Sequence, residues 1–186
     1  TNALTSSHDI KINDTAVGSS TSASAAAKAE AINAISTKTN VTASGYNLVT
    51  IGVDNSETSD AASNISINGN AINFSSASTL TLTIAAINNA AIGDIIASAN
   101  SAGNLQLISS SGADITVAHA GTAGKYFSSH TDATGATISV GSSITFKGQI
   151  QLTHSSTDII KVSGDEVGEI GMQAHASTSS PSAGST

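Results

Sequence analysis

The sequence predicts an α+β protein with two strand–helix–strand repeat units, short β-hairpins and a C-terminal β region. Three observations lead to this fold class. The first two thirds of the chain repeat at an offset of 55 residues. Each copy opens with an alternating apolar and polar segment followed by a turn. Each copy then continues into a segment whose apolar residues recur at helical spacing.

Isoleucine and asparagine positions carry the internal repeat. Both copies keep 20 residues between a first Ile-Asn pair and a second. A fixed internal period indicates a duplicated structural unit. The matched positions are Ile10, Ile12, Asn13, Ala16, Val17, Ala31, Ile32, Asn33 and Val41 in the first copy, and Ile65, Ile67, Asn68, Ala71, Ile72, Ala86, Ile87, Asn88 and Ile96 in the second.

Each copy is predicted to begin with a small hairpin. The alternation at residues 10–12 and 65–67 is typical of a half-buried strand. Asn13-Asp14 and Asn68-Gly69 follow, and these residue types tolerate the positive φ of a tight turn.

A helix follows the hairpin in each copy. Residues 22–36 are rich in Ala, and Lys28 and Glu30 are predicted to point away from the apolar face. In the second copy, residues 79–84 alternate as a strand would, but the alignment with the first copy favours a helix. The predicted apolar faces are Ala25, Ala29, Ile32 and Ile35 in the first copy, and Leu80, Ile84, Ile87 and Ala90 in the second.

Short strands and hairpins are predicted after each helix. The predicted strands are residues 41–44, 46–53, 94–99, 105–109, 115–119, 138–140, 144–146, 150–152 and 159–162. We expect a first unit at residues 1–60, a second at 61–130, a β-hairpin region at 131–175 that completes the domain, and a flexible tail or linker at 176–186.

The composition predicts a dissolved surface and a thin core. The chain has 33 Ser and 22 Thr, no Arg and a formal net charge of −7. Six scattered Lys form no basic stripe, so nucleic acid is not an expected partner. No Cys is present, which excludes thiol catalysis and disulfides. No apolar run is long enough for a membrane span, and the start at Thr1 without a signal peptide suggests a piece of a longer protein.

The repeated pattern resembles the flagellin "IN" motif over roughly residues 9–118. In this family a strand with Ile-x-Ile-Asn leads into an Ala-Ile-Asn helix end and then a strand with Val-x-Ala-Ser. The first copy has these elements at residues 10–13, 31–33 and 41–44. The second copy has them at residues 65–68, 86–88 and 96–99, and residues 103–107 look like the usual family ending.

The resemblance implies a variable outer domain (of the D2/D3 kind) of a bacterial flagellin, hence a secreted, extracellular structural protein of the flagellum that serves motility. The long heptad-patterned terminal helices of flagellins are missing, so neighbouring subunits would be contacted through domains absent from this sequence. The filament-cap (hook-associated) protein remains an alternative within the family. O-linked glycosylation of exposed hydroxyls is expected from the resemblance, at no particular residue.

No catalytic, cofactor-binding or metal-binding residue is nominated, and the chain is not expected to be an enzyme. The histidines have no ligand spacing, and the serines lie in no Gly-x-Ser-x-Gly motif. The acidic cluster Asp165, Glu166 and Glu169 is expected to be solvated. Residues 54–60 slightly resemble a calcium loop without its central Gly and final Glu. The histidines are His8, His119, His130, His154 and His175.

The main alternative function is an adhesin or lectin-like module that binds glycans or a host surface. Such a site would use aromatic platforms, and only five aromatic residues exist, with Tyr126 and Phe127 as the adjacent pair. Asn-x-Ser/Thr sequons occur at Asn13, Asn40, Asn64 and Asn73, a number that chance accounts for in a sequence this rich in hydroxyls. The other aromatic residues are Tyr46, Phe74 and Phe146.

Overall fold

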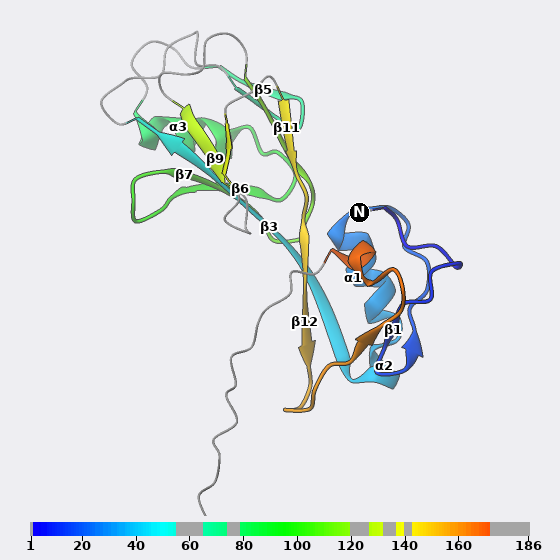
Figure 1. Cartoon of the computed structure of the whole chain (residues 1–186). Coiled ribbons are helices and arrows are strands. Elements are labelled where there is room, and N and C mark those ends of the chain that lie inside the picture. Colours follow the sequence, from blue (N-terminus) through cyan, green and yellow to red (C-terminus); the bar gives the residue numbers. More distant parts are fainter. Residues whose placement is uncertain are drawn as a thin grey trace, which may run out of the picture.

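The computed structural model describes residues 2–54, 65–73, 79–119, 127–131, 137–139 and 143–171. These residues form two lobes that are joined by long antiparallel strands (Figure 1). The helices are α1 (Ala25–Asn33), α2 (Ser36–Thr39), α3 (Leu80–Asn89) and the 3-10 helix η2 (Val167–Ile170). The strands are β1 (Lys11–Ile12), β2 (Thr15–Ala16), β3 (Val41–Val53), β4 (Ile65–Ile67), β5 (Asn70–Ile72), β6 (Ile95–Ala99), β7 (Leu105–Ser109), β8 (Ile115–His119), β9 (Phe127–Thr131), β10 (Thr137–Ser139), β11 (Ser143–Phe146), β12 (Gln149–His154) and β13 (Val162–Ser163).

The fold is rich in β-structure. Its strands form three antiparallel sheets, with the orders β13-β1-β2, β10-β9-β3-β7-β6 and β11-β8-β4-β5, and β12 pairs with β3 beside the second of these. The three α-helices are short. The sheet component of the predicted α+β class is therefore present, and helices make up a smaller share than expected.

Strand β3 is the spine of the molecule. Its first half, from Val41 to Tyr46, pairs with β12, and its second half pairs with β7 on one side and β9 on the other. At ~3.3 Å per residue, its 13 residues span about 40 Å. The sequence predicts two separate strands here, but the expected break between them, at Gly45, is absent. The backbone continues as one strand through both lobes.

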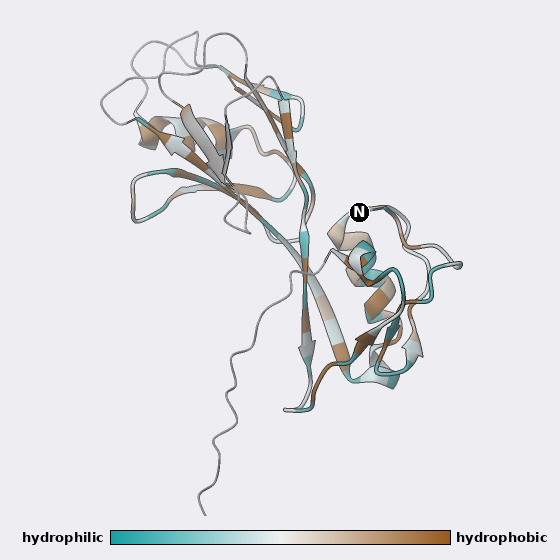
Figure 2. Ribbon diagram, viewed as in Figure 1, coloured by the Kyte–Doolittle hydropathy of each residue, from teal (hydrophilic) through white to brown (hydrophobic). Residues whose placement is uncertain are grey.

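The first lobe has its own core. Residues from α1, the start of β3, β12 and η2 close over the β1–β2 hairpin (Figure 1). Burial alternates along β3, and in its first residues the apolar Val41 and Ala43 face inward while the polar Thr42 and Ser44 face outward; Figure 2 shows alternating colours along the strand. The buried residues of this core are Leu4, Ile10, Ile12, Val17, Ala25, Ala29, Ile32, Val41, Ala43, Ile150 and Ile170.

The second lobe has a separate and larger core. It lies between the sheet that contains β3, β7 and β6 and the sheet that contains β4 and β8, with α3 packed against it. Its residues are Val49, Ile51, Val53, Ile65, Ile67, Ile72, Ile87, Ile92, Ile95, Ala97, Leu105, Leu107, Ile115, Val117, Phe127 and Phe146. The boundary between the two cores falls near the middle of β3.

Both predicted helices form. In the second copy α3 overrides the strand-like alternation, because a helix lines up Leu80, Ile84 and Ile87 on one face against the core. Thr79 caps this helix by accepting a hydrogen bond from the Leu82 amide at 3.5 Å. Ala90 follows the helix and is exposed, so the predicted apolar face ends earlier than expected.

The prediction that Lys28 points away from the packed face of α1 is wrong. This side chain is only 1% exposed and lies among the buried residues of the helix. Small alanines on that face let the helix approach closely, and the long aliphatic part of a lysine fills the remaining space. Glu30 is exposed, as predicted.

The predicted match of Val41 with Ile96 is wrong by one residue. Val41 is fully buried, whereas Ile96 is 61% exposed and its neighbour Ile95 is buried. Because side chains alternate between the two faces of a strand, a slip of one residue moves each of them to the other face. Ile95 is therefore the position that corresponds to Val41.

Within the predicted β-hairpin region, β10 pairs antiparallel with the preceding strand β9. The later strands β11, β12 and β13 do not form hairpins among themselves, which corrects that part of the prediction. Strand β11 pairs with β8, β12 with β3, and β13 with β1. These partner strands lie far away in the sequence, and they have buried faces that need covering. The local sequence of β11, β12 and β13 does not reveal which strands these are. The tail from residue 172 onward and most of the connections predicted at residues 54–63 and 120–135 lie outside the described residues. Within the second connection, residues 127–131 form strand β9, so that part of the prediction is wrong.

Candidate functional site

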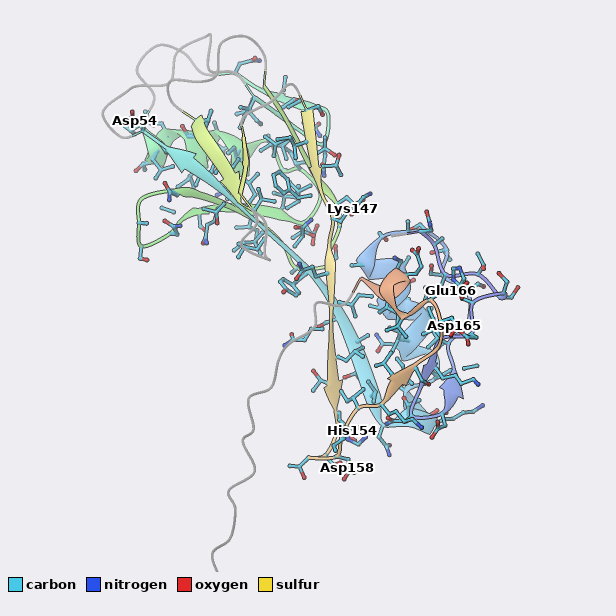
Figure 3. All side chains as sticks on the ribbon, viewed as in Figure 1. Asp54, Lys147, His154, Asp158, Asp165 and Glu166 are labelled. Atoms are coloured by element: carbon cyan, nitrogen blue, oxygen red, sulfur yellow. The ribbon has the colours of Figure 1, made fainter. Side chains whose placement is uncertain are left out.

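The polar candidates from the sequence lie far apart. In Figure 3, Asp54 is at the outer end of one lobe, and His154 and Asp158 are at the opposite end of the other. Asp165 and Glu166 lie on a third surface of the first lobe (Figure 3). Within the described ranges, no group of three His, Asp or Glu side chains is placed to hold a metal ion.

His154 takes part in a local turn. Ser156 Oγ lies 2.9 Å from His154 Nδ1 and donates to Asp158 Oδ2 at 2.6 Å. The serine stands between the histidine and the carboxylate, whereas a catalytic triad needs the histidine in the centre. This arrangement orders an exposed loop and gives no activated nucleophile. Side chains of His119, His130 and His175 lie outside the described part.

The acidic cluster is held by hydrogen bonds to the chain's own backbone. Asp165 donates its backbone N–H to Asp9 Oδ1 at 2.8 Å, and the Glu169 carboxylate accepts from the backbone and side chain of Asn2. The Asn2 contacts, led by its backbone N–H, hold the pKa of Glu169 below its ordinary value. The cluster therefore fastens the two ends of the described chain together.

A second carboxylate orders the turn after β7. Asp94 accepts from Ser109 Oγ at 2.9 Å and from the Ser111 N–H at 2.8 Å. Burial opposes ionisation of Asp94, but these hydrogen bonds outweigh it and lower the pKa of the carboxyl below its ordinary value. Ser109 is fully buried, so the carboxylate supplies the acceptor that its hydroxyl needs.

Two asparagines, one after β1 and one after β4, each extend the pairing of their hairpin strand by a further pair of hydrogen bonds. Asn13 donates its backbone N–H to the Lys161 carbonyl at 2.8 Å, and its Oδ1 accepts from the Lys161 N–H at 2.9 Å. Asn68 makes the same pair of bonds with Thr116, at 2.8 and 2.7 Å. Both residues have positive φ, 47° and 48°, as predicted for the turns.

Two further asparagines cap open sheet edges. Asn33 Nδ2 donates to the Ala43 carbonyl at 2.9 Å, and its Oδ1 accepts from the Ala43 N–H at 2.7 Å. Asn88 makes the same two bonds with Ala97, at 3.0 and 2.8 Å. A side-chain carboxamide has the donor and acceptor of a peptide group, so each asparagine replaces one residue of a further strand. This blunts an edge on which another chain could pair.

Three glycines form a tight neck between the lobes. A Cβ on Gly148 would lie 1.9 Å from the Gly112 carbonyl oxygen, and one on Gly45 would lie 2.3 Å from the Ser111 oxygen. A Cβ on Gly112, which has φ of 74°, would lie 2.7 Å from Gly45 Cα. Only residues without a side chain allow the backbones to come this close.

A buried amide fixes the neck. Asn47 is 1% exposed, and its Nδ2 donates to the Ala113 carbonyl at 3.0 Å and to the Phe146 carbonyl at 2.9 Å. Lys147 lies between the two lobes (Figure 3) and pairs with Asp114 at 2.6 Å. This ion pair is partly exposed, so the buried amide contributes more to the geometry than the ion pair does.

Lys28 has a buried ammonium group beside this neck. Its Nζ donates to the Glu169 carbonyl, which belongs to η2. Burial lowers the pKa of Lys28, while the negative charges of Glu169 and Asp114 oppose that shift. The lysine thus attaches the C-terminal 3-10 helix to α1 at a cost in desolvation.

Tyr46 is the exposed aromatic residue of the first lobe's sheet. It is 37% exposed, on the outer face of β3, and its hydroxyl donates to Gln149 Oε1 at 2.7 Å. Phe127 and Phe146 are buried in the second core. Of the adjacent aromatic pair Tyr126 and Phe127, Phe127 therefore does not present its ring to a ligand. Tyr126, Phe74, Asn64 and the calcium-like segment after Asp54 lie outside the described residues.

Sequence reasoning missed the roles of Asn47, Lys28 and the neck glycines. A single Asn or Gly carries no local signal for a long-range contact, so these residues could not have been found by pattern. The similarity between residues 105–107, Leu-Gln-Leu, and residues 150–152, Ile-Gln-Leu, was visible in the sequence and would have indicated that β12 has the same role as β7.

No family model matches the chain, and no curated protein matches it. Within the described residues, no helix has both the length and the apolar character that a membrane span requires.

Proposed function

We propose that this chain is a structural, surface-exposed module of a bacterial filament protein of the flagellin kind, acting at the filament exterior and not as an enzyme. The proposal starts from the paired Ile-x-Ile-Asn and Ala-Ile-Asn elements of the sequence. It includes two strand–helix–strand units, secretion to the cell exterior, a contribution to motility and sugars on exposed hydroxyls.

The observation that carries the proposal is the meeting of the two ends of the described chain. Asn2 donates from its backbone N–H and its Nδ2 to the Glu169 carboxylate, across 167 positions of sequence. Both residues belong to the first lobe. A module whose ends lie together fits between two segments of a longer chain without changing their path. In the flagellin family that the sequence resembles, long helices at the two ends of the chain flank such an outer domain.

The surface chemistry agrees with a role at a water-facing exterior. The outer face of the β3–β12 ribbon carries exposed hydroxyl and amide side chains without a charge. Uncharged hydroxyl-rich faces stay hydrated, and the net charge of −7 disfavours non-specific association of copies. The residues of this face are Thr42, Ser44, Gln151 and Thr153.

The test is the coding sequence on either side of this chain in its gene, followed by immunogold labelling of intact cells. Long heptad-patterned helices at both ends and gold along filaments are expected. Gold confined to filament tips would assign the cap protein instead. A signal peptide together with a cell-wall or outer-membrane anchor would overturn the filament proposal and favour the adhesin.

A glycan-binding module is the second candidate, and Tyr46 is the observation that favours it. An exposed aromatic ring beside Gln149 and Ser44 offers a stacking surface for a sugar and neighbouring hydrogen-bonding groups. On a glycan array, a specific signal lost in Tyr46→Ala and kept in Thr42→Ala would support it. Absence of specific retention for the unmodified chain would remove this candidate.

A further inference from the structure

We propose that the chain is a nested duplication, in which the second unit is inserted into a turn of the first, and that the turn at Ser101–Gly103 is the matching insertion site of the second unit. Residues 47–148 occupy the same position in the first unit that three residues occupy in the second. The proposal goes beyond the filament role and does not rest on it.

The hairpins give the first line of argument. In one lobe β1 pairs with β13, and Asn13 makes its two backbone-type bonds with Lys161. In the other lobe β4 pairs with β8, and Asn68 makes the same two bonds with Thr116. Lys161 and Thr116 are thus equivalent positions, although the first lies far beyond the end of the second unit.

The helix ends give an independent equivalence. Asn33 and Asn88 each lie at the C-terminal end of a helix. The side chain of each forms hydrogen bonds with both the N–H and the carbonyl of one alanine, which is Ala43 for Asn33 and Ala97 for Asn88. Each of these alanines also lies opposite a leucine on the neighbouring strand. Ala43 lies opposite Leu152. Ala97 likewise lies opposite Leu107.

The ladder continues in the same register until the insertion. Two residues after each clamped alanine, Gly45 lies opposite Ile150, and Ala99 lies opposite Leu105. In the first lobe the next pair is Tyr46 with Gln149. The next pair in the second lobe is joined by a bond from the N–H of Asn100 to the carbonyl of Asn104, 2.9 Å long. Beyond these pairs, residues 47–148 link the two strands in one lobe, and Ser101–Gly103 link them in the other.

The sequence keeps a trace of the same relation at an offset of 45 residues. Residues 105–107 match residues 150–152, and Ile115 and Val117 match Ile160 and Val162. The order of elements is then hairpin, helix, strand, antiparallel strand and closing strand in both units, with the short helix α2 added in the first unit. The large difference is the link between the two antiparallel strands.

The physical reason such a link tolerates a whole domain is that its two ends are already adjacent. The strand pair holds them side by side, so an inserted body with close ends costs little closure entropy. The Ser101–Gly103 link has a positive φ of 77° at Gly103, and Asn100 Oδ1 accepts from the Ala102 and Asn104 N–H groups, but these bonds stay within the link. At the Asn68-Gly69 turn, with φ of 48° and 79°, the side chain of Asn68 bonds to Asp114 and Thr116 far away in the sequence, so an insertion there breaks long-range contacts.

The experiment inserts a stable antiparallel coiled-coil hairpin, whose ends lie side by side, in place of Ala102 in the full chain. The matched control carries the same hairpin between Asn68 and Gly69. Thermal unfolding is followed by circular dichroism, together with hydrogen exchange of the Ala97 and Thr116 amides. We expect the Ala102 variant to keep protection of both amides and to melt within about 4 °C of the parent, and the control to lose both.

Two results would overturn the proposal. One is loss of amide protection or a much larger fall in melting temperature for the Ala102 variant. The other is equal tolerance of the hairpin at both turns, because the Ser101–Gly103 link would then be no different from a hairpin turn that holds no insertion in either unit.

Discussion

Replacing Asn47 with Asp tests the buried amide of the neck. The two side chains have nearly the same shape, so packing stays unchanged and only the chemistry differs. Asn47 donates two hydrogen bonds to the Ala113 and Phe146 carbonyls, at 3.0 and 2.9 Å. An ionised carboxylate at this position would instead place a negative oxygen against two carbonyl oxygens in a site that is 1% exposed in the parent.

The expected magnitude follows from the lost bonds. Loss of the two hydrogen bonds that Asn47 donates costs about 1–3 kcal/mol each, so the loss at pH 7 is about 4 kcal/mol before any repulsion by the charge. A domain of this size loses about 2–4 °C per kcal/mol, which gives a fall in melting temperature of about 8–16 °C.

The deficit of Asn47→Asp should also depend on pH. Burial beside carbonyl oxygens raises the pKa of the new carboxyl in the folded state above its unfolded value near 3.9. The stability contributed by the protonated form is then fully present below about pH 4 and is lost as pH rises through the folded pKa. When protonated, the carboxyl can donate one of the two original bonds, so the deficit should shrink as pH falls.

The assay is urea unfolding of the parent and the variant at pH 7 and pH 4, with Asn40→Asp as a control that places the same charge change on an exposed residue. Asn47→Leu removes both donors without adding a charge, and its deficit should be the same at the two pH values. A deficit below about 1 kcal/mol for Asn47→Asp at pH 7, or one that does not change with pH, would contradict the role given to the buried amide.

Three further changes have defined outcomes. Gly148→Ala puts a methyl group 1.9 Å from a backbone oxygen and should lower the free energy of unfolding in urea by at least about 3 kcal/mol. The control Gly18→Ala has nothing within 4 Å of the added methyl group and should change stability little. Similar effects of the two substitutions would contradict the tight neck. Asn88→Ala removes both caps of the β6 edge and should cost about 2 kcal/mol and promote dimers in light scattering, with a purely monomeric, unchanged variant arguing against edge capping. Burial lowers the folded pKa of Lys28, so the unfolded state binds more protons between that pKa and about 10.5, and the stability of the parent should rise with pH in this window. In Lys28→Met this rise in stability should disappear. If the rise persists in the variant, another group causes it.

Several elements could be predicted because their causes are local. The Asn68-Gly69 turn needs positive φ, and asparagine and glycine supply it whatever the rest of the chain does. Helix α3 is predictable through its repeat partner α1, although the local alternation at residues 79–84 favours a strand. The core contact of Leu80, Ile84 and Ile87 decides this competition in favour of the helix.

Other elements could not be predicted because their causes are contacts between distant residues. Gly45 is expected as a break between strands, but it lies within one strand whose two halves pair with β12 and β7, and Ser111 approaches it too closely for a side chain. Lys28 is expected as a surface residue, but η2 covers it. The partner of β12 was missed because residues 149–154 taken alone do not state which strand has a free edge, and only their match with residues 105–107 indicates it.

Local sequence was sufficient to place the Asn13-Asp14 and Asn68-Gly69 turns and most apolar positions of the two helices, because these depend on backbone preference and on spacings of two or 3.6 residues. Long-range packing decided that β3 serves both lobes, that β12 and β13 return to the first lobe, and that three glycines and Asn47 form the neck. Those choices depend on which buried surfaces and free backbone groups meet across a hundred residues, and only the folded chain brings them together.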